Sequence, residues 1–202
     1  MGVYGADLNY ASVFEQTTET MLYLQCSRTL GKELGVEDIF DEQTIERIEY
    51  NLELDDSMQV IISEVFWKMN SYLEEEDREN ISTLIIAGGW IEGVYLSTQL
   101  ARIAPENEAL KKRIAEQKYS LENLIGLLES YENNEMAEDI LEELKELKQS
   151  FDKISSNKTN GENTVDENGV TTIGGAIELQ MDNALLEEIT AKIVEIRTDI
   201  IN

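Results

Sequence analysis

The stretch ISTLIIAGGWIEGVYLSTQLARI, residues 81–103, decides the fold. Its apolar side chains fall on every face of a helix, and Glu92 is the single acidic or basic side chain between Ser82 and Ala101. A helix that is apolar all round is normally surrounded by other helices. We therefore expect residues 81–103 to form the buried central helix of an all-α bundle.

The glycines of this stretch predict a close helical neighbour. They do not form a phosphate loop, because no Gly-Lys-Ser/Thr follows them and no strand precedes them. A glycine inside a helix costs about 0.5–1 kcal/mol relative to alanine, so three together indicate a packing or binding reason. Gly89 and Gly93 lie one turn apart, which would let the helix that carries Asp7 come close; a gap that faces a ligand is the alternative.

Apolar residues at spacings of three and four predict the other helices. We expect one helix from about residue 6 to 32, a short one at 41–52, and longer ones at 58–73, 110–131, 136–154 and 182–201. Together these give six or seven helices in a single domain spanning residues 1–202. Residues 155–177 break the helical pattern. Asn168-Gly169 between NTV and VTTI is typical of a type I′ turn, which predicts a small β-hairpin or a long loop near residues 160–175.

Two pairs of similar segments suggest an internal duplication. Asp7-x-x-Tyr10-x-Ser and Glu92-x-x-Tyr95-x-Ser share one pattern. The similar segments ERIEYNLELDDSMQVII and KRIAEQKYSLENLIGLL, with the first pair, would define copies at about residues 2–75 and 86–155. The first helices of two such copies would pack as a central pair and bring the two acids and the two tyrosines together.

Composition excludes several classes of function. Asp plus Glu number 42 against 16 Lys plus Arg, a formal net charge of −26, so nucleic acid and anionic lipid surfaces are not expected partners. The chain has no histidine and one cysteine, Cys26, which excludes a Ser-His-Asp triad, a Cys-His pair, an intrachain disulfide and a zinc cluster. We expect no metal site, no cofactor and no enzymatic activity, and we expect Cys26 to be a small buried apolar residue.

Glu92 is the residue that the apolar pattern leaves unexplained. An ionised carboxylate in apolar surroundings must be paired, hydrogen-bonded or protonated, and Arg28 and Arg47 are candidate partners. The candidate ligand-binding residues are Glu92, Trp90, Tyr95, Asp7 and Tyr10. Two nearby carboxylates could bind a cation or act as acid and base, or they could simply be hydrogen-bonded to the two tyrosines.

Four segments of the chain resemble an uncharacterised family of bacterial cell-envelope lipoproteins. They are GVYGADLNYASVFEQTTETM, ERIEYN, DRENISTLIIAGGWIEGVYLSTQLA and RIAEQKYSLENLI, and the resemblance covers nearly the whole chain. Members of that family carry a lipoprotein signal and a further N-terminal segment, both absent from these residues. The resemblance implies a lipid anchor upstream and an extracytoplasmic location, periplasmic or at the outer membrane. It implies no activity.

The sequence therefore predicts a non-enzymatic extracytoplasmic envelope domain that binds an unknown protein partner or small ligand. The apolar run at 84–96 is interrupted by Glu92 and is short for a bilayer, so we expect no membrane insertion by this segment itself. The alternatives are a purely structural scaffold domain and, with less support, a carboxylate-based enzyme or cation-binding protein.

Overall fold

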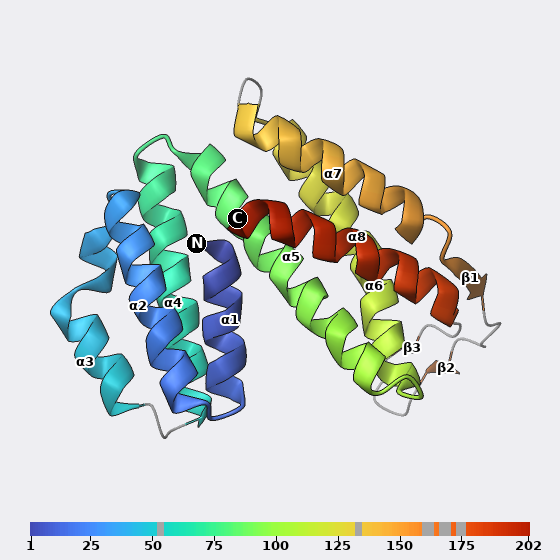
Figure 1. The fold of residues 1–202 in the computed structure, drawn as a ribbon, viewed down its shortest axis with the longest axis horizontal. Coiled ribbons are helices and arrows are strands. Elements are labelled where there is room, and N and C mark those ends of the chain that lie inside the picture. Colours follow the sequence, from blue (N-terminus) through green and yellow to red (C-terminus); the bar gives the residue numbers. More distant parts are fainter. Residues whose placement is uncertain (52–54, 132–134, 159–163, 166–170, 173–176) are drawn as a thin grey trace.

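A computed structural model describes residues 1–51, 55–131, 135–158, 164–165, 171–172 and 177–202, and it confirms the predicted all-α bundle (Figure 1). The helices of these residues are α1 (Gly2–Val13), α2 (Thr17–Glu33), the 3-10 helix η1 (Glu37–Phe40), α3 (Glu42–Tyr50), α4 (Asp55–Glu75), α5 (Glu79–Ile103), α6 (Glu108–Glu129), α7 (Glu135–Phe151) and α8 (Asn183–Ile201). The described residues thus contain eight α-helices, one more than the upper limit predicted.

Helix α5 is the shared wall between two groups of helices. It packs against α1 and α4 on one side and against α6 and α8 on the other. Figure 1 shows α1–α4 gathered at the left of α5 and α6–α8 at the right. Ala87, Ile91 and Val94 of α5 enter the apolar core of the second group, whereas Ile81 and Ile85 pack on Met69 and Leu73 of the first. The prediction of a central helix is confirmed.

The prediction that α5 is covered on every face holds only in part. Ile86 is 48% exposed, Leu100 is 37% exposed and Ile103 is 80% exposed, so three large apolar side chains of the helix are exposed. By length and composition alone α5 would also suffice to cross a membrane, a test that the core helix of a soluble protein passes equally. In this structure it packs against the four helices named above, and its Trp90 also reaches Phe151 of α7.

The N-terminal region contains two helices, so the prediction of one helix at 6–32 is wrong. The chain reverses at Phe14–Gln16, where Glu15 adopts a left-handed backbone with φ of 53° and the Gln16 amide donates to the carbonyl oxygen of Ala11 at 2.8 Å. No glycine or proline marks this turn, which is why the helical pattern runs through it unbroken. Cys26, predicted to be buried, is exposed on α2.

The close neighbour of α5 is α1, as predicted, and of the two glycines expected to allow the contact Gly89 does so and Gly93 does not. A Cβ on Gly2 would collide with the Ile85 carbonyl and lie 2.6 Å from the Gly89 amide nitrogen. A Cβ on Gly88 would lie 3.3 Å from the Val3 amide nitrogen, whereas one on Gly93 would meet nothing within 4 Å. Gly2, Gly88 and Gly89 therefore form the contact, and Gly93 takes no part in it.

Short strands occupy the region between α7 and α8 that was predicted to hold a hairpin. Strand β1 (Ser155–Lys158) pairs antiparallel with β4 (Ile177–Gln180), and β2 (Thr164–Val165) pairs antiparallel with β3 (Thr171–Thr172). The two strands of the predicted hairpin are thus present, and they lie within a second ladder that extends to Gln180. The Asn168-Gly169 turn itself lies outside the described residues.

The duplication stays a prediction. Helices α1 and α5 are adjacent, as two equivalent first helices would be. The second pair of similar segments does not occupy equivalent structures, because residues 46–62 include the end of α3 and the start of α4 while residues 112–128 lie within α6.

Candidate functional site

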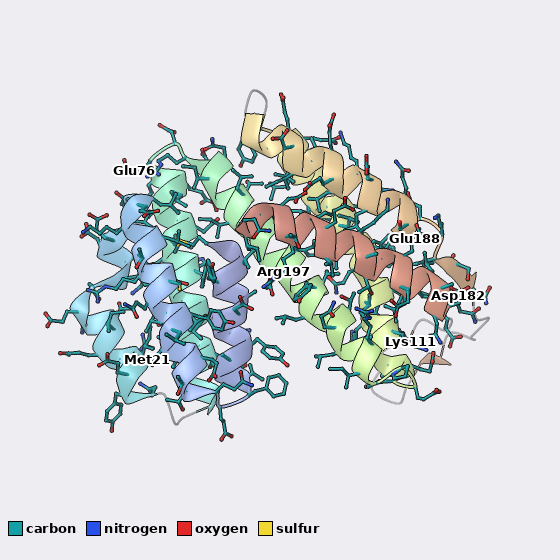
Figure 2. The ribbon with its side chains drawn as sticks, viewed as in Figure 1. Met21, Glu76, Lys111, Asp182, Glu188 and Arg197 are labelled. Carbon is teal, nitrogen blue, oxygen red and sulfur yellow. The ribbon has the colours of Figure 1, made fainter. Side chains whose placement is uncertain are left out.

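Glu92 lies at the centre of a buried polar cluster where α5 meets α1 and α8. Its side chain has no exposed surface, and its Oε2 accepts a hydrogen bond from Nε of Arg197 at 2.5 Å. Figure 2 places Arg197 on the C-terminal half of α8, where that helix lies over α5 beside α1. The expectation that Glu92 is paired with an arginine is confirmed. The candidates Arg28 and Arg47 are wrong: the partner is Arg197, and Arg47 binds Glu64 at 2.6 Å.

Arg197 is held by an aromatic ring as well as by the carboxylate. Its guanidinium carbon lies 4.3 Å from the centroid of the Tyr95 ring, a cation–π contact. Tyr95 is one helical turn beyond Glu92 on α5, so the two residues present an anion and a ring face to the same cation. Hydrogen bonding to Glu92 raises the pKa of Arg197 although burial opposes that shift.

Asp7 joins this cluster from α1. Its side chain is nearly buried, with 7% relative exposure, and burial, the charge of Glu92 and hydrogen bonding with Glu92 raise its pKa to about 7 although the charge of Arg197 lowers it. Arg197 therefore binds the carboxylate of Glu92, and its charge also acts on the carboxyl group of Asp7. The predicted approach of Asp7 to Glu92 is confirmed.

A tyrosine from α2 borders the same cluster, and the sequence analysis did not select it. Burial raises the pKa of Tyr23, and the negative charges of Asp7 and Glu92 raise it further. The ring of Tyr23 lies 6.3 Å from that of Tyr4 on α1, centroid to centroid. Four helices thus contribute to the cluster, and α2 was missed because nothing in the spacing of its residues distinguishes Tyr23 from an ordinary packing aromatic.

Trp90 and Tyr10 make their described contacts elsewhere. Trp90 packs against Phe151 of α7 with ring centroids 6.5 Å apart, in the core of the second group of helices. Its buried indole nitrogen has no hydrogen-bond partner among the described residues. Tyr10 packs against Phe14 with the two rings tilted and their centroids 4.6 Å apart. Of the five predicted residues, the described contacts therefore bring Asp7, Glu92 and Tyr95 together.

The hydrogen bonds of Glu92 determine what the cluster can do. Oε1 of Glu92 is buried and accepts from no N–H or O–H donor in the described part of the chain. Asp7 can supply a donor only when it carries a proton, because an ionised carboxylate accepts hydrogen bonds and cannot donate them. Since Glu92 is fully enclosed and Asp7 nearly so, a substrate has no direct path to either carboxylate in this structure.

An open groove lies next to this cluster, between α1, α4 and α5. It has a volume of about 310 Å³. Leu73, Met69 and Ile62 of α4 are among its apolar walls, together with Ile85 and Ile86 of α5. The α1 wall consists of Gly5, Ala6 and Asn9, where Gly5 faces the ring of Phe66 closely enough that an added Cβ would collide with it.

The polar groups of the groove are all uncharged. They are the side chains of Asn9, Ser63, Asn70 and Ser82. Asn70 is held in one orientation, because its Nδ2 donates to Oε1 of Glu74 at 2.8 Å while its Oδ1 accepts from the hydroxyl of Ser82. This pair links α4 to α5 at the edge of the groove.

Sequence reasoning missed the groove because its residues come from three separate segments. Gly89 lines it and belongs to the stretch that predicted either a close neighbour or a ligand-facing gap. The structure shows both features next to each other at this residue: the Gly2 carbonyl oxygen would lie 3.6 Å from a Cβ on Gly89, and the groove begins beside it.

Comparison with known proteins gave no relative: no protein-family model, curated protein or solved structure matches this chain.

Proposed function

We propose that the chain is a non-enzymatic extracytoplasmic binding domain that takes a small, neutral, mostly apolar ligand in the groove between α1, α4 and α5. The observation that carries this proposal is the groove itself, which combines apolar walls with four uncharged polar side chains. Small-molecule sites are typically concave, largely apolar, preformed and about 300–1,000 Å³ in volume. The extracytoplasmic location rests on the resemblance to envelope lipoproteins.

The lining of the groove argues for a neutral ligand. None of its lining residues is charged, in a chain with a formal net charge of −26. An anion would be repelled by the field of the whole protein, and a charged group would lose its hydration without gaining a counter-charge. A molecule the size of two fused or linked aromatic rings, with one hydrogen-bonding group near Asn70, fits this environment.

The neutral dye N-phenyl-1-naphthylamine, whose fluorescence increases in apolar surroundings, tests the proposal. We expect saturable binding to the wild-type protein. Ser63→Trp should reduce the affinity at least about tenfold, because Ser63 is an exposed lining residue and the indole would occupy the groove. Val60→Trp on the same helix is the matched control, since Val60 is 54% exposed and does not line the groove.

Two results would decide against a ligand site here. Dye binding that is absent would leave the scaffold hypothesis, in which the glycines serve packing alone. Binding that Ser63→Trp and Val60→Trp affect equally would place the dye elsewhere. The alternative of a carboxylate-based enzyme requires access to Asp7 and Glu92, which the burial of both side chains does not favour.

A second candidate function is the binding of a cationic partner between α7 and α8. A groove of about 640 Å³ there has Ile140, Ile196 and Ile200 among its lining residues. Its six carboxylates are Asp139, Glu142, Glu143, Glu146, Glu195 and Asp199, and none takes part in an ion pair within the described residues. Lys192 donates instead to the Glu146 carbonyl oxygen at 3.0 Å. An amphipathic cationic helix would match both the apolar and the acidic parts.

A fluorescein-labelled helical peptide of lysine and leucine tests this second candidate by anisotropy. Charge reversal within the groove, Glu143→Lys with Asp199→Lys, should weaken binding far more than Glu33→Lys with Glu46→Lys, which changes the net charge equally at exposed positions outside it. Equal effects of the two pairs would show that only the net charge attracts the peptide.

A further inference from the structure

The contacts of α1 with its neighbours are of two kinds. Close to its start, Gly2 lies directly against the backbone of α5, and Gly5 receives the ring of Phe66 from α4. Further along, α1 carries the nearly buried Asp7 against α5, where Oε2 of the fully enclosed Glu92 binds Arg197 of α8 and Oε1 of Glu92 has no donor among the described residues. The first kind depends only on shape. The second depends on whether a proton is present.

We propose that the Asp7–Glu92 pair is a proton-dependent latch that holds α1 against α5, and that it thereby sets the position of the α1 wall of the neighbouring groove. In the closed state the Asp7 carboxylic acid donates its proton in a hydrogen bond to the Glu92 carboxylate, whose other bond is to Arg197. On release the proton passes to solvent, and two carboxylates remain with one guanidinium. The part that concerns the groove rests on the proposed function.

The charges around Asp7 show why one proton matters. From α5 it faces Glu92, with Tyr95 one turn further on; from α8 it faces Arg197; from α2 it faces Tyr23. The α4 side meets α1 at this level through the ring of Phe66. Among the described residues, Arg197 is the cation whose charge acts on Asp7, and it is already bound to Glu92 at 2.5 Å. An ionised Asp7 therefore adds a negative charge that no second cation in the described part of the chain balances.

The groove wall and the latch are consecutive residues of one helix. Gly5, Ala6 and Asn9 line the groove, and Asp7 lies between them on the adjoining face of α1. Any movement of α1 away from α5 carries that wall with it. The latch therefore gives the groove a dependence on proton concentration, although no ionisable group lines the groove itself.

Two measurements on the full chain test the latch. Carbon-13 NMR of the carboxyl groups should show Asp7 titrating near neutral pH in the wild-type protein, far above an ordinary aspartate. Amide hydrogen exchange of α1, corrected for intrinsic rates, should report an opening constant that rises about tenfold between pH 6 and pH 8, the increase calculated from pKa values of 3.8 when open and about 7 when closed. Amides of α6 serve as the internal reference.

Asp7→Asn is the decisive variant, because its amide can donate to Glu92 at every pH. Its α1 opening constant should be independent of pH over this range, while Asp38→Asn, a substitution of the same type at an exposed aspartate, should behave as the wild type. Titration of Asp7 below about pH 5, or an α1 opening constant that changes less than twofold in the wild type, overturns the latch. The NMR titration needs no variant and decides the matter even if Asp7→Asn fails to fold.

The consequence for the groove is measured separately with N-phenyl-1-naphthylamine at pH 6 and pH 8. We expect weaker binding at pH 8 in the wild type and equal binding at both values in Asp7→Asn. Dye binding that is absent at both values, with α1 opening that still depends on pH, overturns the proposed function and leaves the latch standing. Dye binding that is equal at both values in the wild type, with α1 opening that does not respond to pH, overturns the latch and leaves the binding groove.

Discussion

Glu92 and Arg197 are 105 residues apart in the chain, and the 2.5 Å hydrogen bond between them joins the central helix to the last one. The carboxylate is fully enclosed while 21% of the arginine side chain is exposed, so the cost of burial falls mainly on Glu92. Asp7 then adds the N-terminal helix to the same pair. The single buried carboxylate of Glu92 thus links α1, from the first group of helices, to α8, from the second group.

Removing the cation should be far more damaging than the size of the side chain suggests. Arg197→Met would leave Glu92 enclosed without a partner, and breaking a buried pair from one side costs about 3–5 kcal/mol. Urea unfolding followed by circular dichroism measures this loss. Arg102→Met on α5 is the control, because its partner Glu187 lies 3.5 Å away with both side chains about half exposed, and its stability should stay close to wild type. Equal losses would mean that Glu92 finds another donor.

The glycines of the α1–α5 contact should respond in opposite directions to alanine. Gly2→Ala places a methyl group against the Ile85 carbonyl and should lower the free energy of unfolding by about 1–3 kcal/mol through overpacking. Gly93→Ala meets open space within a helix and should raise stability by up to about 1 kcal/mol. Thermal unfolding of the two variants checks both signs. A destabilised Gly93→Ala would show that the space beside Gly93 is needed.

The sequence predicted a helix correctly where apolar residues recurred at helical spacing without interruption. α4, α6, α7 and α8 fall close to the predicted ranges because burial on one face imposes a regular spacing. The turn at Glu15 was not readable, since a left-handed residue other than glycine leaves no mark in the pattern. Tertiary packing of α1 on α2 and α5 selects that turn.

The two carboxylates of the candidate site could be predicted from the sequence, whereas the arginine that pairs with Glu92 could not. Glu92 stood out because one charge in an apolar helix needs an explanation, and Asp7 stood out by its similarity in pattern. Arg197 could not be chosen among the available arginines, because the pairing depends on how α8 crosses α5. The groove could not be predicted for the same reason: its walls on α1, α4 and α5 become neighbours only in the folded chain.

A buried hydroxyl makes Glu188 matter more than an ordinary surface acid. Ser150 has no exposed surface, and its hydroxyl donates to Oε1 of Glu188 at 2.6 Å, while Lys153 binds both carboxylate oxygens. Glu188→Ala would leave that hydroxyl without its acceptor and should lower the melting temperature by a few degrees. The adjacent Glu187→Ala, which removes only an exposed and distant ion pair, should leave the melting temperature unchanged. Identical melting temperatures for the two variants would contradict this assignment.

The stability of the whole chain should be greatest in mildly acidic solution, and the sign follows from two opposing sets of groups. The pKa of Asp7 is raised from 3.8 to about 7, so the folded state binds the extra proton and stability falls as pH rises between these values. The pKa values of Asp41, Glu64, Asp152 and Glu188 are lowered by their hydrogen-bonding partners, so their contribution is lost only as pH falls below about 4. A maximum between these limits is the result.

Melting temperatures measured from pH 4 to pH 9 in one buffer mixture check this maximum. The wild type should melt several degrees higher at pH 5.5 than at pH 8, and Asp7→Asn should lose most of that difference by becoming more stable at pH 8. The general repulsion of a chain with net charge −26 also weakens at lower pH, and it is common to both proteins. Asp38→Asn removes one carboxylate from the exposed surface and therefore measures how much the loss of a single negative charge changes the pH dependence of the melting temperature. If Asp7→Asn and Asp38→Asn reduce the change of melting temperature with pH by the same amount, the pH dependence comes from net charge alone.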